Sequence, residues 1–319
     1  MMISRKKICI LGCFLLLLLC VLFEHFFESV SYNIVPHSVL TNVYTRESKG
    51  YHIAVATMVT SDDYIDSANV LYFSLHREIP SHLLLQIHFI ALLIENRNND
   101  VINSKLQGWN KVYVPLLAPP TNNVFPRFRD QFTKLHLWNM VYFSRIVYLD
   151  SDTLCVGDIS ALFKNVSKHF GVILDWESGM IQKHFNMGVF SIAPNADEFK
   201  RLNSLRVTHR GYRIDTAEQG FLNSIYRDHT QIDIFPFEFN GNLAAAVQSP
   251  LFWKLKFSEL KIIHYTWIKP FDVLRFNHSD YIFCNESIKL WYVVKAQMIG
   301  NGTLSRVGSQ TISFNIGEQ

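Results

Sequence analysis

The chain has few cysteines, five in 319 residues. Three of them, Cys9, Cys13 and Cys20, lie in an N-terminal hydrophobic run. Only Cys155 and Cys284 remain outside that run, which permits one disulfide at most and excludes a small scaffold stapled by disulfides. Because Cys155 lies in an apolar stretch, we expect it more simply to be a buried core residue.

The sequence also lacks internal repeats, low-complexity stretches and a marked excess of charge. Its 30 basic and 27 acidic residues nearly cancel and are interspersed. No basic stripe with interleaved aromatic residues is present, so we expect no nucleic-acid partner. The rest of the composition is that of a globular protein, with room for one large domain or two smaller ones.

The N-terminal segment contains a hydrophobic run that differs from the rest of the chain. Basic residues precede the run at 8–27, which is interrupted by one Glu–His pair. Its length approaches that of a spanning helix, and the preceding basic residues place that end in the cytosol. We therefore predict a cytosolic tail at 1–7, a transmembrane signal-anchor at 8–27 and a stem at 28–50. The alternative is a cleaved signal peptide with a weak small-x-small site at 29–31.

Four Asn-x-Ser/Thr sequons follow this run, at Asn165, Asn277, Asn285 and Asn301. Each one alone is a common chance match, but together they favour a lumenal location for the part of the chain beyond the run. We therefore predict a type II protein of the Golgi or endoplasmic reticulum membrane, held there by its N-terminal helix, with the main domain in the lumen.

Strands and helices are expected to alternate from residue 51 onward. Strands are predicted at 52–59, 83–94, 111–114, 145–149, 171–174, 188–192 and 261–264. Helices are predicted at 64–75, 132–143, 197–205 and 216–226. This alternation predicts an α/β fold with a single, mostly parallel sheet flanked by helices. The folded domain would span 51–275, and residues 276–319, which lack a clear pattern, would form a C-terminal extension.

Two carboxylates, Asp150 and Asp152, follow the predicted strand 145–149. An Asp-x-Asp pair is frequent by chance and can be a turn with capping aspartates. Here apolar residues flank the pair, and buried charges need partners, which favours a shared divalent cation. His264, also at the end of an apolar run, would be the third ligand, although it could be a satisfied core histidine. Two carboxylates and one imidazole favour Mn²⁺ or Mg²⁺ over a thiolate-seeking metal.

Five segments give the chain a family resemblance, and they are Phe132–Trp138, Arg145–Thr153, Phe185–Phe190, Glu218–Asn223 and His264–Phe271. Each resembles a motif of one family, and the motifs occur in the same order in the chain. The first is similar to Thr-Lys-Leu-x-x-Trp, and the second to the strand that ends in the Asp-x-Asp pair. The last three are similar to Phe-Asn-Ser-Gly-Val, Asp-Gln-Gly-x-Leu-Asn and His-Phe-x-Gly-x-Lys-Pro-Trp. The chain thus resembles the glycogenin-like retaining glycosyltransferases of family 8 over about residues 51–272. The resemblance implies a Rossmann-like glycosyltransferase-A fold and a UDP-sugar donor.

The resemblance also implies roles for individual residues. The metal ligands would be Asp150, Asp152 and His264. The residues that bind the uridine, the diphosphate or the donor sugar would be Thr60, Ser61, Tyr64, Asp175, Asn186 and Lys269. The residues nearest the reaction, counted here as catalytic, would be Lys134, Glu218 and Gln219. Glu218 departs from the usual Asp of the family, and the residues around Asp175 match it poorly.

We therefore predict a Mn²⁺-dependent retaining glycosyltransferase of the secretory pathway. It would move a sugar from a UDP-sugar to a glycan, glycoprotein or glycolipid acceptor. The alternative is a catalytically inactive nucleotide-sugar or glycan-binding protein of the same fold, which only the change at Glu218 supports. A nucleotidyltransferase that makes the donor would need a glycine-rich phosphate loop near the start of the chain, and the sequence has none.

Overall fold

The computed structural model describes residues 52–164, 167–275, 278–300 and 311–312. The chain divides into two compact units, 1–49 and 50–319. The predicted tail, anchor and stem lie outside the described residues, as do the sequon asparagines other than Asn285. None of the helices in the described part is both long and apolar enough to cross a membrane.

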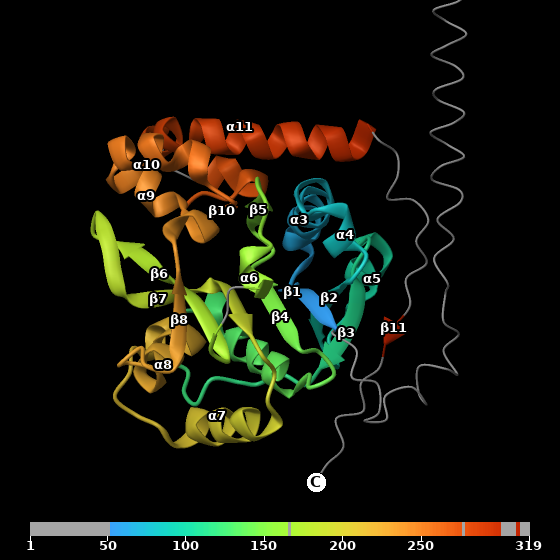
Figure 1. Cartoon of the computed structure of the whole chain (residues 1–319), viewed down its shortest axis with the longest axis vertical. Coiled ribbons are helices and arrows are strands. Elements are labelled where there is room, and N and C mark those ends of the chain that lie inside the picture. Colours follow the sequence, from blue (N-terminus) through green and yellow to red (C-terminus); the bar gives the residue numbers. More distant parts are fainter. Residues whose placement is uncertain (1–51, 165–166, 276–277, 301–310, 313–319) are drawn as a thin grey trace, which may run out of the picture. The chain divides into compact units, whose positions relative to one another are not determined.

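A central sheet of eight strands forms the middle of the second unit (Figure 1). Its order is β11-β3-β2-β1-β4-β7-β6-β8. The strands are β1 (Ile53–Met58), β2 (Ile87–Ile94), β3 (Asn110–Val114), β4 (Arg145–Leu149), β6 (Phe170–Glu177), β7 (Met180–Ile192), β8 (Ile232–Phe235) and β11 (Thr311–Ile312). β7 runs antiparallel to both of its neighbours, and all other neighbouring pairs in this sheet are parallel. The predicted α/β fold with a mostly parallel sheet is confirmed.

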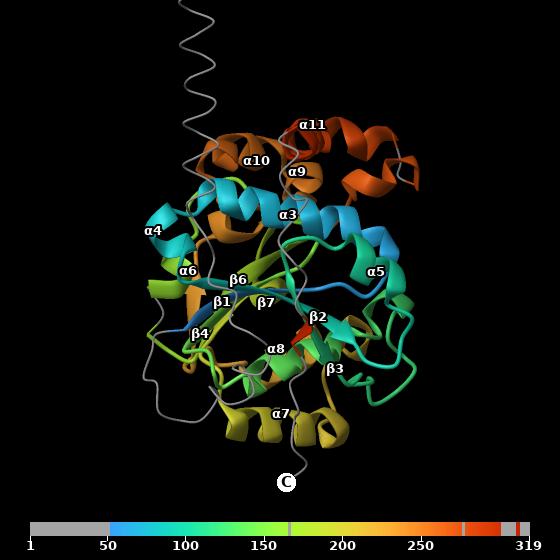
Figure 2. The ribbon, with the colours of Figure 1, turned by 90° about the vertical axis from the view of Figure 1, so that its right-hand side faces the viewer.

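Helices cover both faces of this sheet (Figures 1 and 2). They are α3 (Ile65–Glu78), α4 (Ser81–Leu84), α5 (Asp100–Lys105), α6 (Ala161–Lys164), α7 (Ala196–Thr208), α8 (Ala217–Ile225), α9 (Leu243–Gln248), α10 (Pro250–Lys256) and α11 (His278–Gly300). α3 lies over one face and α7 and α8 over the other. Because side chains alternate along a strand, Ala54 and Ala56 of β1 enter one apolar cluster and Ile53 and Val55 the other.

Short 3-10 helices also occur among the described residues, and one of them, η3, takes the place of an expected α-helix. They are η1 (Asp62–Tyr64), η2 (Pro126–Phe128), η3 (Gln131–Asn139), η4 (Ile214–Thr216), η5 (Phe237–Asn240), η6 (Phe257–Glu259) and η7 (Pro270–Arg275). The helix predicted at 132–143 is therefore a 3-10 helix that ends earlier. Residues 132–138 are all buried. Their apolar spacing therefore arises because the whole segment is buried, and it does not mark one face of an amphipathic α-helix. The strand predicted at 83–94 begins only at Ile87.

A second, three-stranded sheet contains β5 (Thr153–Cys155), β10 (Ile262–His264) and β9 (Gly241–Asn242), in the order β5-β10-β9. The prediction of a single sheet is wrong in this respect, because the segment 261–264 does not join the central sheet. β10 pairs antiparallel with β5, and the register places His264 opposite Thr153. Since β5 directly follows Asp152, this pairing brings His264 beside the carboxylate pair.

The expectation that residues 276–319 lack a pattern is wrong for 278–300, which form α11. Ile288, Trp291 and Val294 are completely buried in an apolar cluster beneath this helix. The Tyr265 hydroxyl, just after β10, donates to the Ser287 carbonyl at 2.8 Å. α11 therefore holds down the segment that carries His264. Cys155 and Cys284 are both buried and unbridged, which confirms Cys155 as a core residue.

Candidate active site

The residues Asp150 and Asp152 occupy the turn between β4 and β5. One ligand atom each from Asp150, Asp152 and His264 lies within 4.8 Å of the others. The Nε2 atom of His264 is 3.4 Å from Oδ1 of Asp152 and 3.8 Å from Oδ2 of Asp150. Asp152 and His264 are buried, and Asp150 is partly exposed. The backbone N–H of Tyr265 donates to the Asp152 carbonyl at 3.0 Å, which ties the two segments together.

A hydrogen bond sets which nitrogen of His264 faces the carboxylates. Oδ1 of Asn240 lies 2.9 Å from Nδ1 of His264 and can only accept, so Nδ1 carries the proton. The Asn240 amide is held in this orientation because its Nδ2 donates to Oδ1 of Asn186 at 3.0 Å. Nε2 of His264 is thereby the ring nitrogen that faces the carboxylate pair. This is the arrangement that a metal-binding imidazole requires.

Gly188 on β7 makes room for this ring. Its carbonyl accepts a hydrogen bond from the N–H of Asp150 at 2.7 Å, so β7 lies directly beside the turn that carries Asp150 and Asp152. A Cβ atom at position 188 would lie 2.1 Å from Cε1 of His264. The close approach of strand and imidazole therefore requires glycine here.

Lys134, in η3, lies beneath the carboxylate pair and is almost completely buried. Its ammonium is 2.9 Å from Oδ1 of Asp150 and 3.1 Å from Oε1 of Glu218, and it donates to the Met187 carbonyl at 3.2 Å. Burial lowers the pKa of Lys134, but Asp150 and Glu218 together raise it above its usual value. Burial also raises the pKa of Glu218 in spite of the nearby ammonium. Oδ1 of Asp150 additionally accepts from the Tyr148 hydroxyl at 2.7 Å.

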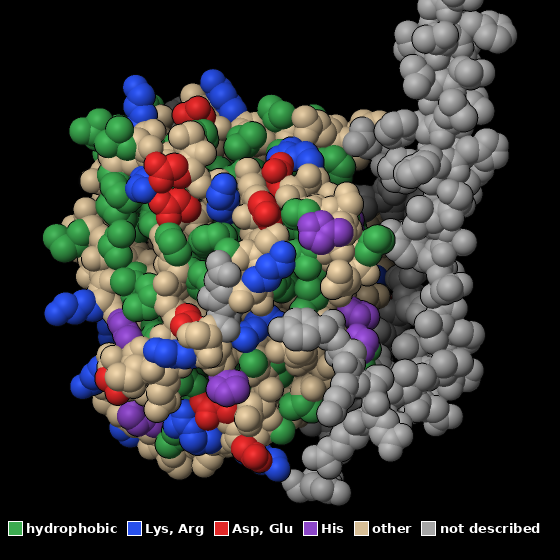
Figure 3. All heavy atoms as spheres, in the orientation of Figure 1, with side chains coloured by type: hydrophobic (Ala, Val, Ile, Leu, Met, Phe, Trp, Pro, Cys, Tyr) green, Lys and Arg blue, Asp and Glu red, His purple; other side chains and the backbone are tan. Residues whose placement is uncertain are grey.

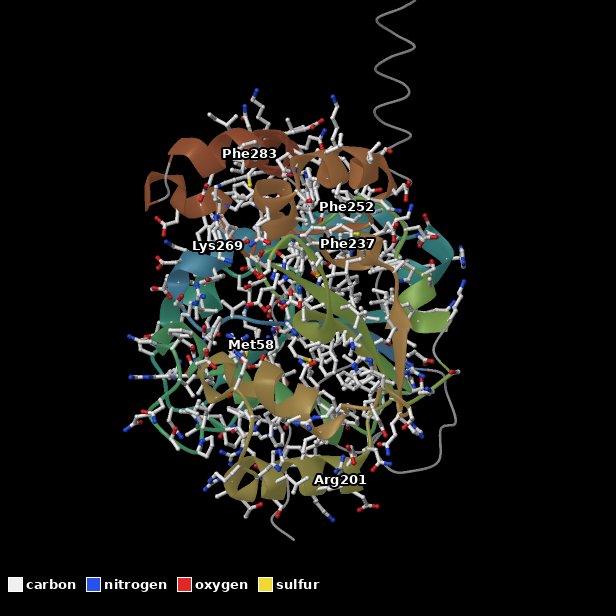
Figure 4. The ribbon with its side chains drawn as sticks, turned by 90° about the vertical axis from the view of Figure 1, so that its left-hand side faces the viewer. Met58, Arg201, Phe237, Phe252, Lys269 and Phe283 are labelled. Atoms are coloured by element: carbon white, nitrogen blue, oxygen red, sulfur yellow. The ribbon has the colours of Figure 1, made fainter. Side chains whose placement is uncertain are left out.

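Lys269, which follows β10, contacts the other side of the pair. Its ammonium forms an ion pair with Asp152 and donates to the Tyr265 carbonyl at 2.6 Å. Burial raises the pKa of Asp152, but Lys269 and His264 hold it well below its usual range. Figure 4 views the molecule from this side, with Lys269 above the labelled Met58 at the end of β1.

A network of amides extends from His264 to Asp175. Oδ1 of Asp175 accepts from Nδ2 of Asn242 at 3.0 Å and from Nδ2 of Asn186 at 3.3 Å. Its Oδ2 accepts from Nε2 of Gln219 at 3.0 Å. Because Asn186 also accepts from Asn240, the network connects the predicted sugar-binding residues with the predicted metal ligand. Asp175, Asn186 and Gln219, far apart in the sequence, are brought together.

The predicted uridine loop follows β1. Thr60 and Ser61 are half-buried, and the Ser61 side chain makes no capping hydrogen bond to η1. The ring of Tyr64 packs edge-on against Phe271, with 5.1 Å between the centroids. Burial raises the pKa of Tyr64, and so do the charges of Asp152 and Asp150, which places Tyr64 within electrostatic reach of the predicted metal site.

Sequence reasoning missed three residues that support the site: Tyr148, Asn240 and Asn242. The two asparagines flank Gly241, and an Asn-Gly-Asn segment has the composition of an ordinary turn. Tyr148 lies within the apolar run of β4, where its hydroxyl could not be recognised as a partner of Asp150. The only available signal was the presence of two amides just upstream of His264.

Comparison with known proteins identifies the family. The family model described as glycosyl transferase family 8 matches residues 55–271, more than half of the chain. The chain belongs to this family, which confirms the resemblance found in its motifs.

Individual relatives agree. The chain is 29% identical over 233 residues to glycogenin-1 of Caenorhabditis elegans, a match that covers 67% of this chain and 49% of that protein. It is 32% identical over 190 residues to inositol phosphorylceramide glucuronosyltransferase 1 of Arabidopsis thaliana, covering 53% of this chain and 34% of that protein. The matches therefore span about half, or less, of the length of these curated relatives.

A solved structure shows the same fold. The galactosyltransferase LgtC, determined with donor and acceptor sugar analogs, superposes with a TM-score of 0.52 at 16% identity. The superposition covers 80% of this chain and 97% of that chain. At this identity the likeness shows the fold alone, and it confirms the predicted glycosyltransferase-A architecture.

Proposed function

We propose that this protein is a retaining glycosyltransferase that uses a UDP-sugar donor and a divalent cation, Mn²⁺ before Mg²⁺. The observation that carries the proposal is the convergence of Asp150, Asp152 and His264, with Nε2 of the histidine oriented toward both carboxylates. The family to which the chain belongs supports the transfer of sugars.

The residues present fit such a cation. Two carboxylates supply hard oxygen ligands, one imidazole supplies its Nε2 atom, and no cysteine takes part. Asp150, Asp152 and His264 would hold the cation. When bound, it would neutralise charge on the diphosphate of the leaving UDP.

The other predicted residues would contact different parts of the donor. Tyr64 with Phe271 offers an aromatic surface for the base, and Thr60 and Ser61 follow β1 on the same side. Lys269 would contact the diphosphate, because its ammonium already lies beside Asp152. The donor sugar would face the hydroxyl-binding residues Lys134, Asp175, Asn186, Glu218 and Gln219.

Retention is supported by the family, and the contacts of the two candidate nucleophiles bear on the route by which it occurs. Both oxygens of Asp175 accept hydrogen bonds from amide side chains, and Glu218 is buried against Lys134. Neither carboxylate is free to attack the anomeric carbon, which disfavours double displacement. We propose that the acceptor hydroxyl attacks on the face from which UDP departs and passes its proton to the leaving phosphate oxygen. An α-linked UDP-sugar then gives an α-linked product.

The test is UDP release from a panel of UDP-sugars with Mn²⁺, followed by NMR of the product. Asp152→Asn is expected to abolish release, whereas Lys200→Gln, on the exposed surface of α7, leaves it unchanged. A β-linked product, or turnover that EDTA does not affect, would contradict the proposal. Binding of a UDP-sugar without any turnover would instead favour an inactive binding protein, the alternative that the change at Glu218 raises.

We further propose the Golgi or endoplasmic reticulum membrane as the location, with type II topology and a lumenal catalytic domain. The support is the basic segment before the run 8–27 and the sequons after it. The acceptor would be a glycan, glycoprotein or glycolipid, and one relative is named for a lipid acceptor. Protease protection of the domain in intact microsomes, together with a mass shift on endoglycosidase treatment, tests this topology. Digestion of the domain in sealed vesicles would exclude it.

A further inference from the structure

A cavity of about 260 Å³ lies along one face of α8, beside the site. Gln219, Asn223 and Arg227 line it at intervals of four residues, along α8 and the turn that follows. His184 of β7 and Arg213 of the loop before α8 also line it. At a rise of 1.5 Å per residue, the helical face from Gln219 to Arg227 is about 12 Å long.

Gln219 belongs both to this cavity and to the amide network of the site. Its Oε1 accepts from the Met187 N–H at 3.1 Å, and its Nε2 donates to Asp175. A second lining residue also reaches the network, since Nε2 of His184 lies 3.9 Å from Oδ2 of Asp175. The cavity therefore adjoins the proposed donor-sugar residues. A molecule bound in it would approach the donor sugar from the side of α8.

The cavity lining is basic. Arg213 and Arg227 line it, and none of the described lining residues is acidic. His184 also lines it, but its Nε2 lies 3.4 Å from Oε2 of Glu177 and 3.9 Å from Oδ2 of Asp175. Arg213 is close to Asp215, at 3.4 Å, and Glu177, at 3.8 Å, both exposed, so its charge is partly compensated. Arg227 has no carboxylate partner among the described residues. In Figure 3 histidines and Lys/Arg side chains gather at the lower left, interspersed with a few acidic side chains.

We propose that this cavity is the acceptor site and that the acceptor is a sugar or polyol that carries an anionic group, a phosphate or a carboxylate. The anionic group lies toward Arg227, where the guanidinium pairs with it in a bidentate manner. The attacking hydroxyl lies toward Gln219. Its oxygen forms the new bond to the anomeric carbon as the bond to the UDP oxygen breaks, and its proton passes to that oxygen. That the ligand is an acceptor depends on the proposed transfer activity; the anion site itself does not.

Titration calorimetry of the full chain with glucose 6-phosphate, glucuronic acid and glucose tests the site. At about 10 mM ionic strength we expect both anionic sugars to bind on the order of tenfold more tightly than glucose, and the advantage to shrink at about 150 mM. Arg227→Gln should remove this advantage without changing glucose binding. Lys200→Gln, which also removes one exposed cation, should change neither. The two anionic probes distinguish phosphate from carboxylate recognition.

Titration of the same variants with UDP and Mn²⁺ reports whether the donor half is folded. Equal binding of glucose and the anionic sugars, or an Arg227→Gln variant that binds them as the wild type does, would overturn the proposal. Preferential binding of the anionic sugars without turnover of any UDP-sugar would support the anion site and contradict the proposed transfer activity. Turnover with no preference for anions would leave the transfer activity standing and overturn the site.

Discussion

At the scale of single residues, the proposed metal site depends on groups that never touch the metal. Asn240 fixes the tautomer of His264, and Asn186 fixes the orientation of Asn240. Tyr148 and Lys134 share one oxygen of Asp150. The carboxylates and the imidazole are thus oriented before a ligand arrives, which lowers the cost of assembling the site.

Asn240→Ala should weaken Mn²⁺ binding by about 10- to 100-fold, because Nδ1 of His264 loses its acceptor and the imidazole is no longer held in one tautomer. The free energy of unfolding should fall by about 1–3 kcal/mol, because two buried hydrogen bonds of the Asn240 amide, to His264 and to Asn186, are lost. Calorimetric titration with Mn²⁺ and thermal unfolding in EDTA measure the two effects. An unchanged affinity for Mn²⁺ would show that the amide does not orient the histidine.

Gly188→Ala should displace the His264 ring, since the added methyl carbon would lie 2.1 Å from Cε1. We expect lower Mn²⁺ affinity and a loss of about 1–3 kcal/mol of stability, the range for overpacking in a closely packed region. Gly300→Ala is the matched control, because nothing lies within 4 Å of a Cβ atom there. If the two variants behave alike in Mn²⁺ titration and thermal unfolding, the close packing against His264 is not essential.

At the scale of secondary-structure elements, the sequence predicts β4, the strand before Asp150 and Asp152. It does not predict how the distant segments that contact this pair are arranged. The apolar run of β4 followed by Asp150 and Asp152 is a local pattern. Whether the segment ending at His264 joins the central sheet or pairs with β5 depends on contacts across more than a hundred residues, which no local period encodes. Asn240 and Asn242 lie between short elements and have no periodicity of their own.

α11 escaped prediction for a different reason. Its buried residues, among them Ile288 and Trp291, alternate with exposed apolar residues such as Ile282 and Val293. A helix that is apolar on several sides gives no clear amphipathic stripe. The sequence therefore predicted neither this helix nor its packing, which includes the hydrogen bond from the Tyr265 hydroxyl to the Ser287 carbonyl.

The element that carries Glu218 and Gln219 begins with an unusual backbone conformation. Ala217 has a φ of 50° and a ψ of −127°, a region that glycine adopts more readily than any other residue. Such a conformation costs about 1–3 kcal/mol and persists where the surroundings enforce it. Ala217 is completely buried at the start of α8, so this cost is incurred beside two proposed catalytic residues.

Ala217→Gly should therefore be tolerated better than an ordinary buried Ala→Gly change. Both remove one methyl group from the core, but only at position 217 does glycine relieve backbone strain. Ala245 lies within α9 and is equally buried, but glycine in a helix also costs about 1 kcal/mol relative to alanine. We therefore expect the free energy of unfolding to fall at least about 2 kcal/mol less in Ala217→Gly than in Ala245→Gly. Urea unfolding of the two variants tests the difference. Equal losses would show that Ala217 is not strained.

At the scale of the whole molecule, the carboxylate Asp152 couples stability to pH. Its pKa in the folded protein is lowered, while in the unfolded chain it titrates near its ordinary value of about 4. As the pH falls below that value, the unfolded chain takes up the proton first. The stabilisation is therefore present above about pH 4 and is lost as the pH falls toward the folded pKa.

Lys269→Met should flatten this acid dependence, because the ammonium that lowers the pKa of Asp152 is removed. The free energy of unfolding, measured by urea titration in EDTA between about pH 5 and pH 3, should decline less steeply in the variant than in the wild type. Lys200→Met removes an exposed ammonium from α7 and serves as the control. Parallel curves for wild type and Lys269→Met would rule out the coupling.

The contact between Lys269 and Asp152 spans 117 positions of the chain. By the time the ribosome has released residue 235, every long strand of the central sheet has been synthesised, yet neither His264 nor Lys269 has appeared. A nascent chain can therefore build its sheet well before it can bind a cation or a nucleotide. A transcript with a premature stop codon between these points would encode an almost complete central sheet without His264 and Lys269, and so without two residues of the proposed site.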